Sequence, residues 1–167
     1  DDKIVPYKTS HYHIAPFQGA EFDPKAMEIH DIKPDHPFRQ AISEEQCLQE
    51  LNEAIAKELD HHSCHKAIIT GHNPTFDLNF IQQAGIRADI KPNLHAFSVF
   101  DTATLSALIF GQTVLAKALF AAQIKHNPQE AHSALYDAEQ TAKLFCFIVN
   151  HSSFDYQGSS NLPIKVY

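Results

Sequence analysis

The stretch KAIITGHNPTFD, residues 66–77, decides the class of fold. Its first five residues are mostly apolar and predict a buried strand. Gly71 and Pro74 interrupt that pattern, a helix is expected over residues 75–84, and Gly85 is placed to end it. A strand that leads through a tight turn into a helix is the unit from which α/β proteins are built.

The sequence downstream repeats this unit. Residues 96–100 predict a second short strand, and Asp101 is placed to cap the helix that follows it, up to Gly111. A further helix is expected over residues 113–122 and a long one over residues 133–150. The alternation predicts an α/β sheet covered by helices.

The sequence upstream supplies fewer clear strands. Residues 7–15 predict an edge strand, residues 23–29 a short helix that opens at Asp-Pro, and SEEQ at residues 43–46 is a capping box for a long helix. A sheet with so many covering helices requires more strands than this chain clearly provides. We therefore expect a single domain over residues 1–167, with the missing central strands lying before Asp1.

The composition is that of an ordinary globular domain. Of 167 residues, 44% are hydrophobic and 20% are charged, and no apolar run approaches the roughly 18 residues of a membrane span, so we expect no membrane contact. The formal charge of −7 argues against a broadly basic nucleic-acid-binding surface, but not against an enzyme that binds only a strand end. Three widely spaced cysteines suit reduced thiols, and a cytoplasmic location is expected.

The stretch AHSALYDAE, residues 131–139, is the most informative for chemistry. His132 precedes the long helix, and Asp137 heads a stripe that continues through Leu144 and Ile148. A buried ionised carboxylate is costly unless a cation or several donors satisfy it, and Mg²⁺ prefers carboxylate oxygens. Alternatively, Asp137 is an acid that the helix dipole favours.

A second candidate lies where the first strand ends. The turn after Gly71 leads to Asp77, and ligands of layered α/β sheets gather at the carboxyl ends of strands. The alternative is that Asp77 only caps a helix and that Phe76 belongs to the core.

Taken together, these stretches resemble a known family. His132-x-Ala134-x-x-Asp137 is similar to the third motif of the DEDDh (DnaQ-like) 3′-to-5′ exonucleases, and Asn73-x-x-Phe76-Asp77 is similar to the second. Further similarity, specifically to the ribonuclease T type, extends from about His13 to His151 and includes residues 100–103, 111–118, 131–137 and 141–150. The resemblance implies a ribonuclease H-like three-layer α/β/α fold.

The resemblance also implies a mechanism and its residues. Family members hold two divalent ions, normally Mg²⁺, with four carboxylates, and a histidine acts as general base. By motif, His132 is the base, Asp137 binds metal directly, and Asp77 binds metal directly or through water. The residues implied in nucleic-acid binding are Asn73, Phe76 and Phe97, which include two base-stacking aromatics, and Lys66, which contacts RNA across a homodimer. The implied substrates are the 3′ ends of tRNA and other structured RNA, and single-stranded DNA ends.

The chain departs from the family in two places. The family's first motif is Asp-x-Glu on the opening strand, and the only Asp-x-Glu here is residues 137–139, which already belong to the third motif. We therefore expect an N-terminally truncated domain with little or no activity of its own. In addition, Lys25 and Ile29 stand where the family has an acidic and an aromatic contact, so the terminal-base preference is expected to differ.

Two other functions remain open. One is a noncatalytic RNA-binding or dimerisation module on the same fold. The other is a proofreading exonuclease of a DNA polymerase, against which residues 111–118 favour the ribonuclease. The histidines at residues 11–13 and 61–65 lack the paired spacing of a structural zinc site, and exposed histidines are the preferred interpretation.

Overall fold

Among the residues that the structure describes, a pair of parallel strands forms the sheet. The computed structural model describes residues 3–30, 32–34, 36, 38–131 and 133–151. Strand β1 (Ala67–Gly71) pairs with β2 (Leu94–Asp101), and the carboxyl-terminal residues of the two strands, Gly71 and Asp101, lie opposite each other. The carboxyl ends of both strands therefore meet at one edge, as the sequence predicted for a ligand site.

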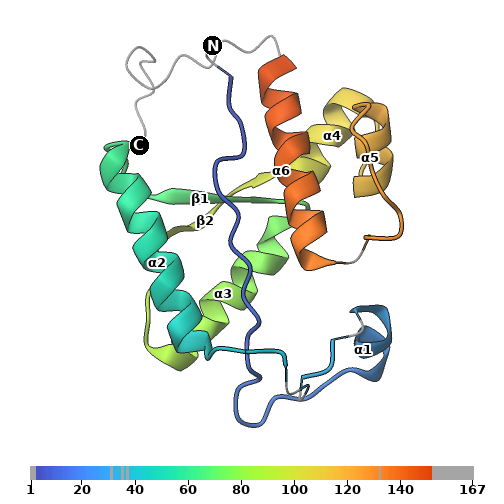
Figure 1. Cartoon of the computed structure of the whole chain (residues 1–167). Coiled ribbons are helices and arrows are strands. Elements are labelled where there is room, and N and C mark those ends of the chain that lie inside the picture. Colours follow the sequence, from blue (N-terminus) through green and yellow to red (C-terminus); the bar gives the residue numbers. More distant parts are fainter. Residues whose placement is uncertain (1–2, 31, 35, 37, 132, 152–167) are drawn as a thin grey trace.

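Helices flank this pair of strands, whereas α1 (Pro24–His30) lies apart from it at the bottom of the view (Figure 1). In chain order the helices are α1, α2 (Glu44–His61), α3 (Pro74–Ala88), α4 (Thr102–Phe110), α5 (Leu115–Ala121) and α6 (Ala134–His151). Helix α3 is the crossover between the strands and contacts both of them, while α2 packs on α3. Helix α6 contacts β1 and packs on α4 and α5. This mixture of helices and parallel strands confirms the predicted α/β class.

The hydrophobic core lies between α5 and α6. Leu119 of α5 and Leu144 of α6 are fully buried, and Ala118, Ala122 and Ile148 join them. Leu144 and Ile148 belong to the stripe that the sequence predicted below Asp137, so the far end of α6 is anchored in the core. That anchor fixes the direction of α6 and with it the position of its first turn.

Local signals placed most helix ends correctly. The Ser43 hydroxyl accepts the amide of Gln46 at 3.1 Å and caps α2, and the Asp101 carboxylate accepts two amides of the first turn of α4. Gly111 ends α4 with a φ of +65°, a conformation that glycine adopts without strain. The capping box of α2 is only half formed, because the Gln46 side chain donates to Glu50 instead of returning to Ser43.

Three expectations about element bounds were wrong. Residues 7–15 form an extended segment with a single bridge, between Ile14 and Ile42, because the described residues pair with this segment at that one point and not along its length. Helix α3 continues past Gly85 to Ala88, and α5 begins later than predicted.

Gly85 serves close packing inside α3. A Cβ atom on it would lie 2.6 Å from the backbone oxygen of Ile90 and 3.2 Å from Pro92 Cδ. The helix ends instead at Ala88, and the capping residue Asp89 has a φ of +52° and donates its amide to the Gly85 carbonyl. Gly85 therefore allows the segment at Ile90 and Pro92 to pack closely against α3. Such a contact has no local sequence signature.

Additional central strands stay a prediction. Among the described residues, β1 pairs with β2 alone, in a two-stranded sheet.

Within the same residues, no single helix is long and apolar enough to cross a membrane, although the bent pair of α4 and α5 passes by length and composition alone.

Candidate active site

A cavity of about 560 Å³ lies at the carboxyl end of β1, between α3 and α6. Asp77 enters it from α3 and Asp137 from α6. The remaining lining residues are Thr70, Gly71, His72, Leu115, Ala134, Ala138, Thr141, Ala142, Phe145 and Cys146. Two carboxylates from distant parts of the sequence thus share one cavity.

Asp77 lies in the first turn of α3. Asn73 precedes this helix with a φ of +65°, and Pro74 occupies its first position, so the chain turns sharply between β1 and Asp77. Burial of the carboxyl group raises the pKa of Asp77 above its usual value, and hydrogen bonding to its own backbone only partly offsets this effect. Burial therefore disfavours the ionised carboxylate, and a nearby cation would favour it.

Asp137 lies at the end of the first turn of α6 and is partly buried. Its amide donates to the Ser133 carbonyl at 2.9 Å. The next residue towards the N-terminus, Tyr136, accepts the Asn127 amide on its hydroxyl at 2.6 Å, so α6 is tied to the preceding loop. His132 lies outside the described residues, and its role as general base stays a prediction.

His72 connects three segments beside the cavity. Its Nδ1 lies 3.0 Å from Thr102 Oγ1, and its Nε2 lies 2.8 Å from the Thr113 carbonyl oxygen. The Thr102 hydroxyl also donates to the Gly71 carbonyl. His72 thereby joins the end of β1 to the start of α4 and to the segment before α5. Nothing in the sequence pointed to this network beyond the position of His72 next to Asn73.

Asp101 is a second group that links the strand ends. It accepts the Asn73 amide at 2.9 Å as well as the amides of Ala103 and Thr104 and the Thr104 hydroxyl. Burial alone raises the pKa of Asp101, but these hydrogen bonds together lower it below the usual value. Asp101 therefore holds the turn that leads to Asp77. The sequence predicted its cap on α4 but not its contact with Asn73.

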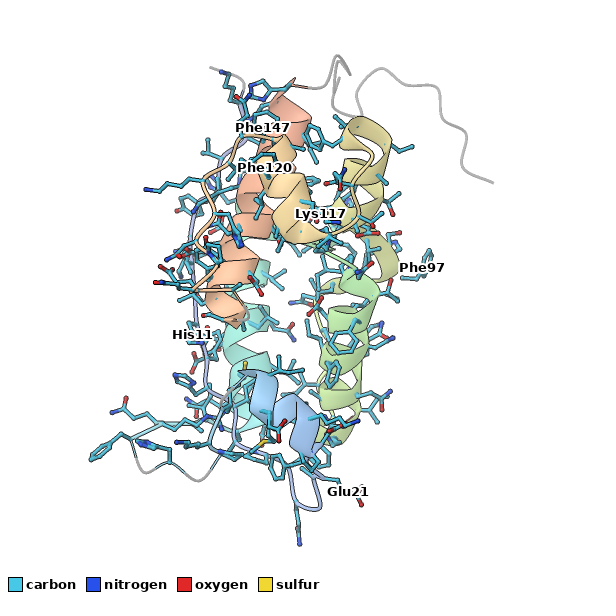
Figure 2. All side chains as sticks on the ribbon, turned by 90° about the vertical axis from the view of Figure 1, so that its right-hand side faces the viewer. His11, Glu21, Phe97, Lys117, Phe120 and Phe147 are labelled. Carbon is cyan, nitrogen blue, oxygen red and sulfur yellow. The ribbon has the colours of Figure 1, made fainter. Side chains whose placement is uncertain are left out.

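The predicted nucleic-acid-binding residues lie at three places. Phe76 is 67% exposed beside Asp77, which rules out the alternative that it belongs to the core, and its ring lies 4.8 Å from that of Phe80. Phe97 is 81% exposed on β2 and projects outward from the molecule (Figure 2). Lys66 is exposed at the amino end of β1, away from the cavity. The side chain of Asn73 makes no cap bond to α3.

The carboxylate pair suits a divalent cation but does not complete a site. Hard cations such as Mg²⁺ bind carboxylate oxygens, and Asp77 gains from a cation because burial disfavours its ionised form. Within the part of the chain that the structure describes, no group of three or more His, Cys, Asp or Glu side chains could hold a metal ion. Asp77 and Asp137 therefore fit as two members of a larger ligand set.

Two acids at the carboxyl end of a parallel strand, beside the exposed ring of Phe76, fit a ligand site that can bind a divalent cation in an α/β protein. Residues 2–145 match the exonuclease family that is named for ribonuclease T. The chain belongs to this family of exonucleases, which generally use divalent metal ions. It is a 3′-to-5′ exoribonuclease and therefore a hydrolase.

Individual relatives agree with this assignment. The chain is 47% identical over 151 residues to the ribonuclease T of Yersinia enterocolitica, a match that covers 90% of this chain and 70% of the relative. It is 47% identical to the ribonuclease T of Yersinia pseudotuberculosis, over 88% of this chain and 69% of that one. The ribonuclease T of Histophilus somni is 46% identical, over 89% and 68% of the two chains.

Proposed function

We propose that this protein trims the 3′ ends of tRNA and other structured RNA, and of single-stranded DNA, by Mg²⁺-dependent hydrolysis of the terminal phosphodiester. The observation that carries the proposal is the cavity that Asp77 and Asp137 share. The exposed ring of Phe76 next to Asp77 supports it, because aromatic stacking binds strand ends without regard to sequence.

Each predicted residue has a separate task. Asp77 and Asp137 would hold two Mg²⁺ ions together with further carboxylates. When bound, such ions stabilise the charge on the attacking and leaving oxygens of the displacement. His132 would take the proton of the attacking water. Phe76, Phe97 and Asn73 would hold the last nucleotides in place.

We propose that the remaining carboxylates come from an Asp-x-Glu segment that these 167 residues do not contain. The family's first motif is absent from this sequence, and the described residues offer no third ligand beside Asp77 and Asp137. A strand that carries this motif would bring its two acids to the cavity if it paired with β1 in parallel, because parallel strands end at the same edge.

We also propose that the protein is a cytoplasmic homodimer. The formal charge of −7 leaves one subunit little attraction for RNA. Lys66 is exposed and lies away from its own cavity, which suits a contact with RNA bound at the partner's site. Sedimentation at micromolar concentration should give a dimer, and a strict monomer would contradict this part of the proposal.

A noncatalytic RNA-binding module is the second candidate. It is favoured by the missing Asp-x-Glu motif, since two carboxylates alone are a weak site for a catalytic metal pair. A proofreading role has less support, because the relatives reported above are ribonucleases T.

One assay separates these candidates. The 167-residue chain is compared with an extended protein, in which a segment carrying the family's Asp-x-Glu motif precedes residue 1. Each is incubated with Mg²⁺ and a 3′-labelled single-stranded oligonucleotide. We expect little or no trimming by the chain alone and robust trimming by the extended protein. Robust trimming by the chain alone would overturn the account of the missing motif, and an inactive, folded extended protein would favour the noncatalytic module.

A further inference from the structure

Strand β2 contains a large bulge in the middle of its pairing with β1. Ala67 pairs with Leu94 and Ile69 pairs with Val99, so the single residue Ile68 lies opposite the four residues 95–98. The backbone groups of a bulge leave the regular ladder of hydrogen bonds. Side chains can supply other partners for these groups.

Two side chains supply these partners. His95 Nδ1 accepts the Ser98 amide at 2.9 Å and the Phe97 amide at 3.4 Å. Gln82, on α3, donates its side-chain nitrogen to the Ala96 carbonyl at 2.7 Å. Because both amides donate to Nδ1, this nitrogen is the acceptor and carries no proton, while Nε2 lies 3.5 Å from Ser98 Oγ. His95 thus hydrogen-bonds to the backbone inside the bulge, and Gln82 connects the bulge to α3.

The bulge determines where Phe97 points. Its ring meets the His95 ring edge to face, with centroids 4.6 Å apart and an interplanar angle of 86°, yet 81% of Phe97 stays exposed. Figure 2 shows the side chain of Phe97 directed away from the body of the molecule. In a regular strand, successive side chains alternate between the two faces of the sheet. Phe97 lies within the bulge, so its direction does not follow this alternation.

We propose that His95 is a positioning residue for nucleic-acid binding, because its unprotonated Nδ1 holds the bulge in the conformation that presents Phe97 to a base. This inference rests on the proposed function, in which Phe97 stacks on a strand end. It assigns to His95 a task that depends on one acceptor atom. It also assigns a supporting task to Gln82, which joins the bulge to the helix that carries Phe76 and Asp77.

Substitutions can separate the acceptor from the ring. His95→Asn keeps an acceptor oxygen near the position of Nδ1, since asparagine often accepts amides two residues further along the chain. His95→Leu keeps the size of the side chain but removes the acceptor. His36→Leu is the matched control, because His36 Nδ1 accepts the Phe38 amide at 3.3 Å beside an exposed phenylalanine, but outside the sheet.

The experiment measures binding of a fluorescent single-stranded oligonucleotide to the 167-residue chain by anisotropy. Loss of one base-stacking ring in Phe97→Ala should raise Kd by about 5- to 150-fold. We expect His95→Leu to raise Kd in the same direction by a smaller factor. The double variant should bind no more weakly than Phe97→Ala, because both changes remove one interaction. His95→Asn and His36→Leu should bind like the wild type.

The outcomes distinguish failure of the role of Phe97 in base stacking from failure of the role of His95 in positioning it. If Phe97→Ala binds like the wild type, the proposed role of Phe97 is wrong and the task of His95 falls with it. If Phe97→Ala weakens binding while His95→Leu does not, only the positioning role is overturned. Equal weakening by His95→Asn and His95→Leu would also overturn it, since the acceptor would then be irrelevant. Thermal unfolding checks that each variant folds. If His95→Leu does not fold, Gln82→Ala takes its place with the same expectations.

Discussion

Each strand of the sheet leads into a helix that has an acid near its start, and the two acids differ in their surroundings. Asp101, at the start of α4, accepts three backbone amides and one hydroxyl, which together lower its pKa. Asp77, in the first turn of α3, has its pKa raised by burial. One acid is stabilised as an anion by the protein itself, whereas the other is held at a cavity where burial disfavours its charge.

This difference indicates which acid serves structure and which suits ligand binding. Hydrogen bonds that stabilise Asp101 also fix the turn at Asn73, so its charge is used within the fold. A carboxylate whose ionised form is destabilised by burial is stabilised when a cation binds to it. Acids with perturbed pKa values of this kind cluster at functional sites.

The largest expected effect is on catalysis. In the extended protein, Asp77→Asn and Asp137→Asn should each lower turnover strongly, because each removes charge that a metal ion needs. We expect each loss to be at least as large as the loss of a general base, which typically costs about 10²- to 10⁴-fold. Asp101→Asn is the matched control and should lose far less, because it keeps an acceptor oxygen. Initial rates of trimming of a 3′-labelled oligonucleotide provide the measurement. Equal losses in Asp77→Asn and Asp101→Asn would refute the contrast between the two acids.

His132 extends the comparison to a group that acts on the water instead of the metal. In the extended protein, His132→Ala should lower kcat by about 10²- to 10⁴-fold and leave KM nearly unchanged. The reason is that a general base acts in the chemical step and contributes little to strand-end binding. Steady-state kinetics measure both parameters. A rise in KM with kcat intact would assign His132 to binding instead.

The two acids should also differ in their effects on stability. Asp101→Ala removes the cap of α4 and should lower the free energy of unfolding by about 0.5–2 kcal/mol. Asp77→Asn should not destabilise the chain at neutral pH and should raise its stability slightly, because it removes a charge that burial disfavours. Urea unfolding of the 167-residue chain measures both changes. A clear loss of stability in Asp77→Asn would mean that its carboxylate is already satisfied within the fold.

The smallest expected effect is a pH dependence of opposite sign. The folded-state pKa of Asp101 is lowered, so its stabilisation is present above the unfolded value of 3.8 and is lost as pH falls through the folded pKa. The folded-state pKa of Asp77 is raised, so its penalty is present above that pKa and is relieved as pH falls towards 3.8. The free energy of unfolding is measured between about pH 3 and pH 7 for the wild type, Asp101→Asn and Asp77→Asn. The difference between the wild type and each variant should isolate the trend of each acid. Trends of the same sign would contradict the prediction.

Local chemistry explains most of what the sequence predicted. Ser43 and Asp101 were identified as caps, and Gly111 as the end of a helix, because each acts on amides or on backbone angles within a few residues. The apolar stripe through Leu144 and Ile148 was found for a similar reason, since helical periodicity is written along the chain. The motifs around Asp77 and Asp137 led to the correct family.

The errors share a different cause. Residues 7–15 have the pattern of a strand, but a strand forms only where another strand lies beside it. Gly85 looked like a helix end, but its role is set by the backbone of Ile90, which the chain brings back against α3. The bulge at residues 95–98 was missed because it arises from the register between β1 and β2.

The sequence by itself determined the α/β class, the family, the caps of α2 and α4, and the residues that could carry the chemistry. Only the tertiary structure decided that Asp77 and Asp137 share one cavity and that Asp101 is bound to Asn73. It alone revealed the surroundings that raise the pKa of Asp77 and lower that of Asp101. The physical reason is that caps and periodicity act over a few neighbouring residues, whereas desolvation and hydrogen bonding depend on atoms that distant segments bring together.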